Sequence, residues 1–441
     1  MPAVVLILLS FAVIVILMRF RVPLAAGLAA GIVVLAALAG VAPALAWKTL
    51  GKTCGNLDMV SVVLTIVLIL LFSDALRLGG RLDRIVSRFV DMGPSPRARL
   101  IAFPALIGLL PMPGGAVFSA PMVEAAGRDL PHLPGQFSAI NYWFRHIWEY
   151  WWPLYPGVII AMGISGLSTG VFIASMIPYT AISVIAGLLF LFPKPKKAAG
   201  NPDSDSAEGL DSPPAHNRNG FAARPAGTVR GLVRQLAPIT IVIIGGVGLE
   251  LLREGVKRFG FEITEPIPRT AIILALVVSI LYTVLADKIR AGNLLRDFAN
   301  RKNFEMVLMV VLVLYYKDLL EAAGLVGRTV AEFQAWHVPL WGVVMLLPFL
   351  VGMITGIQIA AVGVSFPVLI GLAHGAGLPL VSVVVLAYGF AYAGMLLSPV
   401  HFCLLLTKEY FHDGFGIIYK WIAWPVAIVA LGAIALAAAY G

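Results

Sequence analysis

Long apolar stretches separated by short polar segments run through the whole chain. A helix that crosses a bilayer needs about 20 consecutive, mostly apolar residues. Stretches of this kind predict ten transmembrane helices, at 3–20, 24–46, 58–79, 138–163, 168–193, 236–252, 268–286, 304–323, 380–407 and 417–440. The pattern therefore predicts an all-α polytopic membrane protein.

Two further apolar segments, 99–127 and 338–373, are interrupted near their centres by helix-breaking residues. The first contains Leu110-Pro-Met-Pro-Gly-Gly115, and the second contains Gly352-Met-Ile-Thr-Gly-Ile-Gln358. Proline lacks an amide donor and glycine weakens a helix, so we do not expect either segment to cross the membrane as one helix. We interpret both segments as re-entrant hairpins, each of which enters and leaves the membrane on one side.

The second half of the chain repeats the first. Residues 72–89 align with residues 316–333 at a constant offset of 244, and further along the chain the offset becomes 246. The matched identities include Asp74 with Asp318, Gly80 with Gly324, Arg84 with Arg328, Phe89 with Phe333, Pro121 with Pro367, Tyr142 with Tyr388 and Pro153 with Pro399. Internal repeats in a very apolar chain are typical of secondary transporters, whose sites lie where the repeats meet near the bilayer midplane.

Each repeat holds five predicted spans and one hairpin. The first repeat is 1–193, with hairpin 99–127 and a broken helix at 138–163; the second is 236–441, with hairpin 338–373 and a broken helix at 380–407. Because five is odd, the two repeats are expected to have inverted topology. The segment 194–235 is polar, rich in proline and glycine and without apolar periodicity, which predicts a disordered linker.

The basic residues indicate an orientation. Most of the 32 lysines and arginines fall in loops on one side if both termini lie outside and the 194–235 loop is cytoplasmic. Cytoplasmic loops carry the excess of basic residues in membrane proteins, so this orientation is favoured. The net charge of +9 is thereby explained by membrane topology, and we expect no nucleic-acid partner.

Composition agrees with the membrane assignment. Of the 441 residues, 60% are hydrophobic and only 12% are charged, whereas a soluble domain carries about 25% charged residues. The two cysteines, Cys54 and Cys403, lie far apart in apolar sequence. We expect them to be small buried packing residues, with no disulfide and no metal site.

The hairpin tips are the first place where chemistry is expected, because non-helical backbone within a membrane survives only where protein or water satisfies it. If helices begin after Gly114 and after Gly356, their amides and dipoles point to the membrane centre and favour an anion. The alternative is that the glycines and prolines only shape a packed hairpin. The candidate substrate-binding residues at the tips are Pro113, Gly114, Gly115, Ser119, Thr355, Gly356 and Gln358.

The second place is the aromatic span 138–163, which contains Asn141, Arg145 and Glu149 on one helical face. An ionisable group at this depth is costly and usually functional. Two roles for Arg145 are open: it binds an anionic substrate through its planar guanidinium, or it forms an i, i+4 ion pair with Glu149 that holds the span. Asn141, Arg145 and Ser398, which lies at the matched break of the second repeat, are the further candidate substrate-binding residues.

Three further ionisable residues are candidates for ion coupling. His146, Glu149 and His401 would carry a proton if transport is coupled to H⁺. The alternative for each histidine is a hydrogen-bonded packing role.

The segments Leu110-Pro-Met-Pro-Gly-Gly-Ala-Val-Phe-Ser-Ala-Pro-Met-Val123 and Asn141-Tyr-Trp-Phe-Arg-His-Ile-Trp-Glu-Tyr150 resemble an uncharacterised prokaryotic membrane family. That family is grouped with the ion-transporter superfamily, which includes divalent-anion/sodium symporters and gluconate and citrate permeases. The resemblance implies inverted repeats, a scaffold with a moving transport domain, an elevator-type cycle, a homodimer and the cytoplasmic (inner) membrane. The characterised symporters carry Ser-Asn-Thr at their hairpin tips, which this sequence does not.

The sequence therefore predicts a secondary active transporter of a small, carboxylate-like organic anion, coupled to Na⁺ or H⁺. We expect no cofactor beyond a coupling ion. One rival is a lipid or lipid-linked-sugar translocase. Another is an intramembrane enzyme that uses His146, Glu149 and His401, although the chain has neither an H-E-x-x-H nor a G-x-S-x-G motif.

Overall fold

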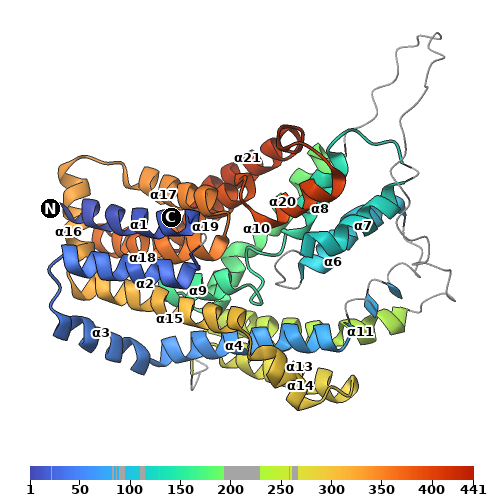
Figure 1. The fold of residues 1–441 in the computed structure, drawn as a ribbon, viewed down its shortest axis with the longest axis horizontal. Helices are drawn as coiled ribbons and strands as arrows, with labels where there is room; N and C mark the ends of the chain where they lie inside the picture. Colours follow the sequence, from blue (N-terminus) through green and yellow to red (C-terminus); the bar gives the residue numbers. More distant parts are fainter. Residues whose placement is uncertain are drawn as a thin grey trace, which may run out of the picture.

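The computed structural model describes residues 1–20, 22–81, 84–85, 87–88, 95–109, 115–128, 130–192, 229–257, 259–260 and 267–441. These residues form helices and connecting segments (Figure 1). The helices before the linker are α1 (Ala3–Arg19), α2 (Leu24–Leu38), α3 (Pro43–Gly55), α4 (Leu57–Leu78), α6 (Pro96–Gly108), α7 (Gly115–Gly127), α8 (Gln136–Arg145), α9 (Pro156–Ser165) and α10 (Thr169–Phe190). Those after it are α11 (Val229–Ile241), the π-helix η1 (Val242–Gly248), α12 (Leu249–Lys257), α13 (Thr270–Ala286), α14 (Ala291–Phe298), α15 (Arg301–Ala322), α16 (Leu325–Ala335), α17 (Leu340–Thr355), α18 (Gln358–Ala376), α19 (Leu380–Leu397), α20 (Phe402–Phe411) and α21 (Phe415–Tyr440).

The fold is that of an all-α polytopic membrane protein. In the described part of the chain, six helical segments are long and apolar enough to cross a membrane. These segments differ in how many of their residues are buried. In the most apolar 18-residue stretch, 78% of the residues are buried in Gln358–Ala376 and in Leu380–Phe411, but only 33% in Phe415–Tyr440. Helices α18 and α19 therefore form the centre of the molecule, and α21 exposes most of its apolar surface at the periphery, as a lipid-facing helix does.

Helix boundaries follow the sequence repeat. Helix α4 begins at 57 and α15 at 301, an offset of 244. Helices α9 and α20 begin at 156 and 402, and α10 and α21 begin at 169 and 415, an offset of 246 in both cases. The repeat seen in side-chain identities is thus also a repeat of structural elements.

Packing between the halves is reciprocal. Helices α2 and α3 of the first half pack on α15 of the second, and the equivalent α13 and α14 pack on α4 of the first. Likewise α7 packs on α20, and its counterpart α18 packs on α9. Helices of each half therefore pack against helices of the other half in an equivalent way.

Two pairs of consecutive helices lie in the segments that the sequence predicts to be hairpins. Helices α6 and α7 pack together, as do α17 and α18, and the two pairs lie toward opposite ends of the molecule's long axis (Figure 1). Helix α16 meets α17 at a bend of 120°. The tip of the first hairpin, 110–114, lies outside the described residues, as do Pro113 and Gly114 within it.

Two sequence predictions of element boundaries were wrong. The predicted span 24–46 is two helices, because α2 ends at Leu38 and Gly40, at a positive φ of 67°, turns the chain before α3 begins. The predicted linker 194–235 is too long, because α11 begins at Val229. The rest of that linker, 194–228, lies outside the described residues.

Candidate functional site

Two broken helices meet at the centre of the molecule. Helix α8 ends at Arg145 and α9 begins at Pro156, while α19 ends at Leu397 and α20 begins at Phe402. Proline within or after each break removes amide donors that a continuous helix would need. The breaks therefore leave main-chain carbonyl groups to be satisfied by other partners.

Buried aromatic residues supply those partners. The hydroxyl groups of Tyr388 and Tyr392 on α19 donate to the carbonyl oxygens of Glu149 (2.9 Å) and His146 (2.5 Å). The Trp148 indole donates to Ala105 on α6 at 2.9 Å. These side chains hold the first break to both the second half and the first hairpin, and the two tyrosines satisfy two of its carbonyl groups.

Arg145 lies where the first hairpin touches α8. Only 2% of it is exposed, and its carbonyl group packs directly against the Cα of Gly108. Its guanidinium lies against Gly115, where an added Cβ would be 2.7 Å from Nη2 and 2.9 Å from Nε. The closest Arg145–Glu149 contact is 3.5 Å, from Nη1 to Oε1, so the predicted i, i+4 ion pair is present.

Asn141 joins three helices. Its Oδ1 accepts from Ser119 Oγ on α7 (2.6 Å), and its Nδ2 donates to the Ala116 carbonyl (3.1 Å) and to Thr407 Oγ1 on α20 (3.2 Å). Asn141 and Ser119 are both fully buried. The structure thus brings together two predicted site residues, and it adds Thr407, which the sequence analysis missed.

The tip of the second hairpin lies on the second break. Gly356 has a positive φ of 65°, and a Cβ there would be 2.8 Å from the His401 amide nitrogen and 3.0 Å from Ser398 Oγ. Only glycine fits such a close approach in this conformation. Thr355 Oγ1 instead donates back to Val351 of its own helix, at 2.7 Å.

Gln358 begins α18 and points to the first half. Its Cγ lies 3.3 Å from the position of a Cβ on Gly157 of α9. The side chain lies beside Tyr388, yet its Oε1 and Nε2 make no hydrogen bond of normal geometry and are buried. A buried amide in this state is costly, and such groups are often found where a ligand or water binds.

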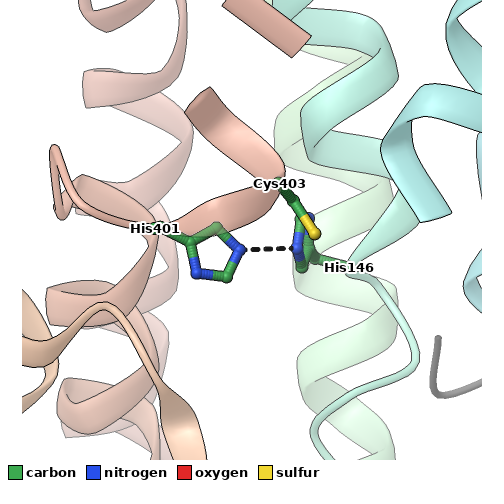
Figure 2. A group of neighbouring side chains, drawn as sticks. All are labelled: His146, His401 and Cys403. Atoms are coloured by element: carbon green, nitrogen blue, oxygen red, sulfur yellow. Dashed lines mark hydrogen bonds between the residues drawn. The ribbon is translucent and has the colours of Figure 1, made fainter. Parts of the chain in front are cut away.

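Histidines from the two halves meet between the breaks. His146 Nε2 and His401 Nε2 are 3.1 Å apart, and Glu149 Oε1 is 3.9 Å from His146 Nε2. The three predicted ion-coupling residues therefore form one group. Cys403 joins it with its thiol (Figure 2). The prediction that both cysteines are buried was wrong for Cys54, which is exposed.

A family model covers most of the chain. The family described as "Protein of unknown function (DUF401)" matches residues 2–206 and 263–439. The chain belongs to the DUF401 family. The matched ranges of DUF401 contain both hairpins and both broken helices, and they leave out 207–262, which includes much of the linker and the elements α11, η1 and α12. No curated protein matches the chain.

Solved structures show the fold. The chain is similar to the YdaH transporter of Alcanivorax borkumensis, described as having an unusual topology, with a TM-score of 0.59 and 13% sequence identity over 88% of this chain and 86% of that one. At this identity the likeness concerns the fold. The family match and the shared fold together confirm the coarser part of the resemblance, a family of polytopic membrane proteins with this all-α fold.

Proposed function

We propose that this DUF401 protein is a secondary active transporter of a small organic anion of the carboxylate class, bound at Arg145. The observation that carries the proposal is the buried guanidinium against Gly115, the first residue of α7. A helix N-terminus carries a positive partial charge, so a cation beside it concentrates positive potential that an anion would neutralise. Glu149 forms an ion pair with the same guanidinium, at 3.5 Å from Nη1 to Oε1.

The division of the helices supports an elevator-type cycle. Helices α6–α10 and α17–α21 pack mainly on one another around the two breaks, and α1–α4 and α11–α15 form a second group around α4 and α15. Figure 1 shows α3, α4, α13 and α14 along one side of the molecule and α17, α19 and α21 along the other. We propose that the first group moves with its substrate against the second.

The remaining parts of the proposal follow from topology and charge. Hairpins at opposite ends of the long axis and reciprocal packing of the halves support inverted repeats. We propose the cytoplasmic membrane of a prokaryote, with both termini outside, as the location, and a homodimer as the assembly. The coupling ion is Na⁺ or H⁺, with His146, Glu149 and His401 as the proton-carrying group in the second case.

The test is thermal unfolding of the purified protein with lactate, succinate, gluconate or methylphosphonate, each with and without Na⁺ and at two pH values. A ligand that binds only the folded state raises its stability by mass action. We expect at least one of the three carboxylates to raise the unfolding temperature, and Na⁺ or pH dependence to identify the coupling ion. No stabilisation by any of the three carboxylates would contradict the proposal.

Variants at Arg145 test whether the anion binds at this residue. Arg145→Lys keeps the charge but loses the planar fork, so we expect a folded protein without the anion-induced shift. A double variant, Arg145→Gln with Glu149→Gln, removes both charges and avoids leaving one of them buried alone. The matched control is Arg77→Lys at an arginine whose side chain is 53% exposed. A shift that survives Arg145→Lys would place the anion elsewhere.

A further inference from the structure

Three metal-binding side chains converge between the two breaks. His146 follows the last residue of α8, His401 precedes the first residue of α20, and Cys403 is the second residue of α20. All three are buried, and their ligand atoms lie within 4.8 Å of one another. Figure 2 shows the Cys403 sulfur beside the two rings, with the imidazoles facing each other through their Nε2 atoms.

Hydrogen bonds to the backbone fix the tautomer of each histidine. His146 Nδ1 lies 2.5 Å from the Tyr142 carbonyl oxygen, and His401 Nδ1 lies 2.6 Å from the Gly356 carbonyl oxygen. A carbonyl oxygen only accepts, so each Nδ1 carries the hydrogen and each neutral ring presents a lone pair on Nε2. The two Nε2 atoms, each with its lone pair, lie 3.1 Å apart. This contact is repulsive unless both lone pairs bind the same electrophile.

We infer that His146, His401 and Cys403 bind one imidazole- and thiolate-preferring transition-metal ion of the zinc class. Tetrahedral zinc with bonds of about 2.0–2.1 Å to nitrogen and 2.3 Å to sulfur places two nitrogen ligands about 3.3–3.4 Å apart. The observed 3.1 Å between the Nε2 atoms is close to this spacing. Nδ1–H bonded to a carbonyl oxygen is also the usual outer-shell arrangement of a metal-binding histidine.

The third donor favours a metal over a proton shared by the two rings. A shared proton would join only the two Nε2 atoms, whereas one metal ion would bind all three groups, whose ligand atoms already lie within 4.8 Å of one another. A thiolate ligand gives the site a soft donor that zinc and related ions prefer over magnesium or calcium. Glu149 Oε1, which lies 3.9 Å from His146 Nε2 and 3.5 Å from Arg145 Nη1, is a carboxylate shared between this site and Arg145.

The site connects the two halves of the chain. His146 belongs to the first repeat, whereas His401 and Cys403 belong to the second. His401 is in turn bonded to Gly356 at the tip of the second hairpin. A bound ion would therefore hold the first break, the second break and this hairpin tip together. The inference does not rest on organic-anion transport, because it follows from the three ligands alone.

Co²⁺ titration of the purified, tag-free full-length protein, stripped beforehand with a chelator, tests the inference. Tetrahedral Co²⁺ absorbs visible light strongly, and a thiolate ligand adds a near-ultraviolet charge-transfer band. We expect both signals to saturate at one Co²⁺ per chain and to disappear when Zn²⁺ is added. Wild-type protein that binds no Co²⁺ or Zn²⁺ would overturn the inference in favour of a proton between the histidines.

Cysteine variants identify the ligand without a large change in shape. Cys403→Ser is expected to lose the charge-transfer band and to weaken Zn²⁺ binding at least about 100-fold, more than the 10- to 100-fold typical of losing an outer-shell partner. The control is Cys54→Ser, at the exposed cysteine, which should keep both signals. A band that survives Cys403→Ser, or that Cys54→Ser abolishes, would show that this cluster is not the site.

A second variant separates ligand loss from misfolding. His401→Gln keeps a polar side chain at the start of α20 and should lose tetrahedral Co²⁺ absorption while the metal-free protein unfolds at a temperature near that of wild type. Metal binding unchanged in His401→Gln would also overturn the inference. Because metal binding is read by absorption and anion binding by thermal shift with named anions, either proposal can fail while the other stands.

Discussion

Two glycines at matched positions set the distance between each hairpin and the broken helix of its own half. Gly108 at the end of α6 packs on Arg145 of α8, and Gly352 of α17 packs on Ala391 of α19. A methyl group at Gly108 would overlap the Arg145 carbonyl oxygen and lie 2.9 Å from its carbonyl carbon. At Gly352 it would overlap the Ala391 carbonyl oxygen and lie 3.0 Å from the Met395 amide nitrogen.

Gly108→Ala and Gly352→Ala should therefore both destabilise the protein. The obstructing atoms belong to the backbone and cannot rotate away, so each hairpin arm must move from its broken helix by more than half an ångström. Overpacking of this kind costs about 1–3 kcal/mol per site. Thermal unfolding of the purified protein, followed by tryptophan fluorescence, should show both variants unfolding several degrees below wild type.

The controls are Gly51→Ala in α3 and Gly327→Ala in α16, where an added Cβ meets nothing within 4 Å. Alanine is favoured over glycine within a helix by about 0.5–1 kcal/mol, so these two variants should equal or exceed wild type in stability. If Gly108→Ala and Gly352→Ala unfold at the temperatures of these controls, the close backbone packing of hairpin on broken helix is refuted.

Two further predictions concern charge and orientation. Asp287→Ala removes the carboxylate bonded to Arg81 at 2.5 Å, whose side chain is 3% exposed. This variant should destabilise the protein by about 3–5 kcal/mol, because the buried Arg81 charge loses its carboxylate partner. Arg77→Ala, at an exposed ion pair, should cost at most about 1 kcal/mol. Thermal unfolding of the two variants measures the difference. A membrane-impermeant maleimide should label exposed Cys54 on intact cells expressing Cys403→Ser; labelling only after lysis would reverse the proposed orientation.

The sequence predicted elements best where the cues are local. Proline within apolar stretches predicted both broken helices, since Pro153 and Pro399 lie in the two breaks. A single proline is a weaker cue, because Pro178 and Pro425 lie inside helices. The repeat offset of 246 also anticipated that α9 and α20 would begin at equivalent residues, 156 and 402. The separate helix α3 was missed, since nothing in the apolar pattern marks Gly40 as the end of α2.

The chemistry of the centre depended on contacts that no local pattern contains. His146 and His401 were both identified as candidates, but their contact joins residues 255 positions apart. Cys403 was interpreted as a packing residue because it lies in an apolar run, and only its distance of two residues from His401 hinted at a shared site. Thr407 reaches Asn141 in the same way, across the two halves.

A comparison of equivalent positions in the two repeats distinguishes contacts that both repeats share from side chains that only the candidate site has. Arg145 and Ala391 both place a carbonyl group against a hairpin glycine, so the backbone role is common to the two halves and the guanidinium is not needed for it. At the offset of 246, His146 corresponds to Tyr392 and His401 to Tyr155. Tyr392 donates to the His146 carbonyl oxygen and Tyr155 to the Gly108 carbonyl oxygen, both at 2.5 Å.

The position equivalent to Cys403 is Gly157, which has no side chain to offer a metal. The two tyrosines at the positions equivalent to the histidines already donate their hydroxyl hydrogens to carbonyl groups. The pseudo-equivalent location therefore lacks all three ligands of the proposed site, although the surrounding helices are equivalent. One metal ion per chain follows from this asymmetry, and a Co²⁺ titration that saturates at two ions per chain would contradict it.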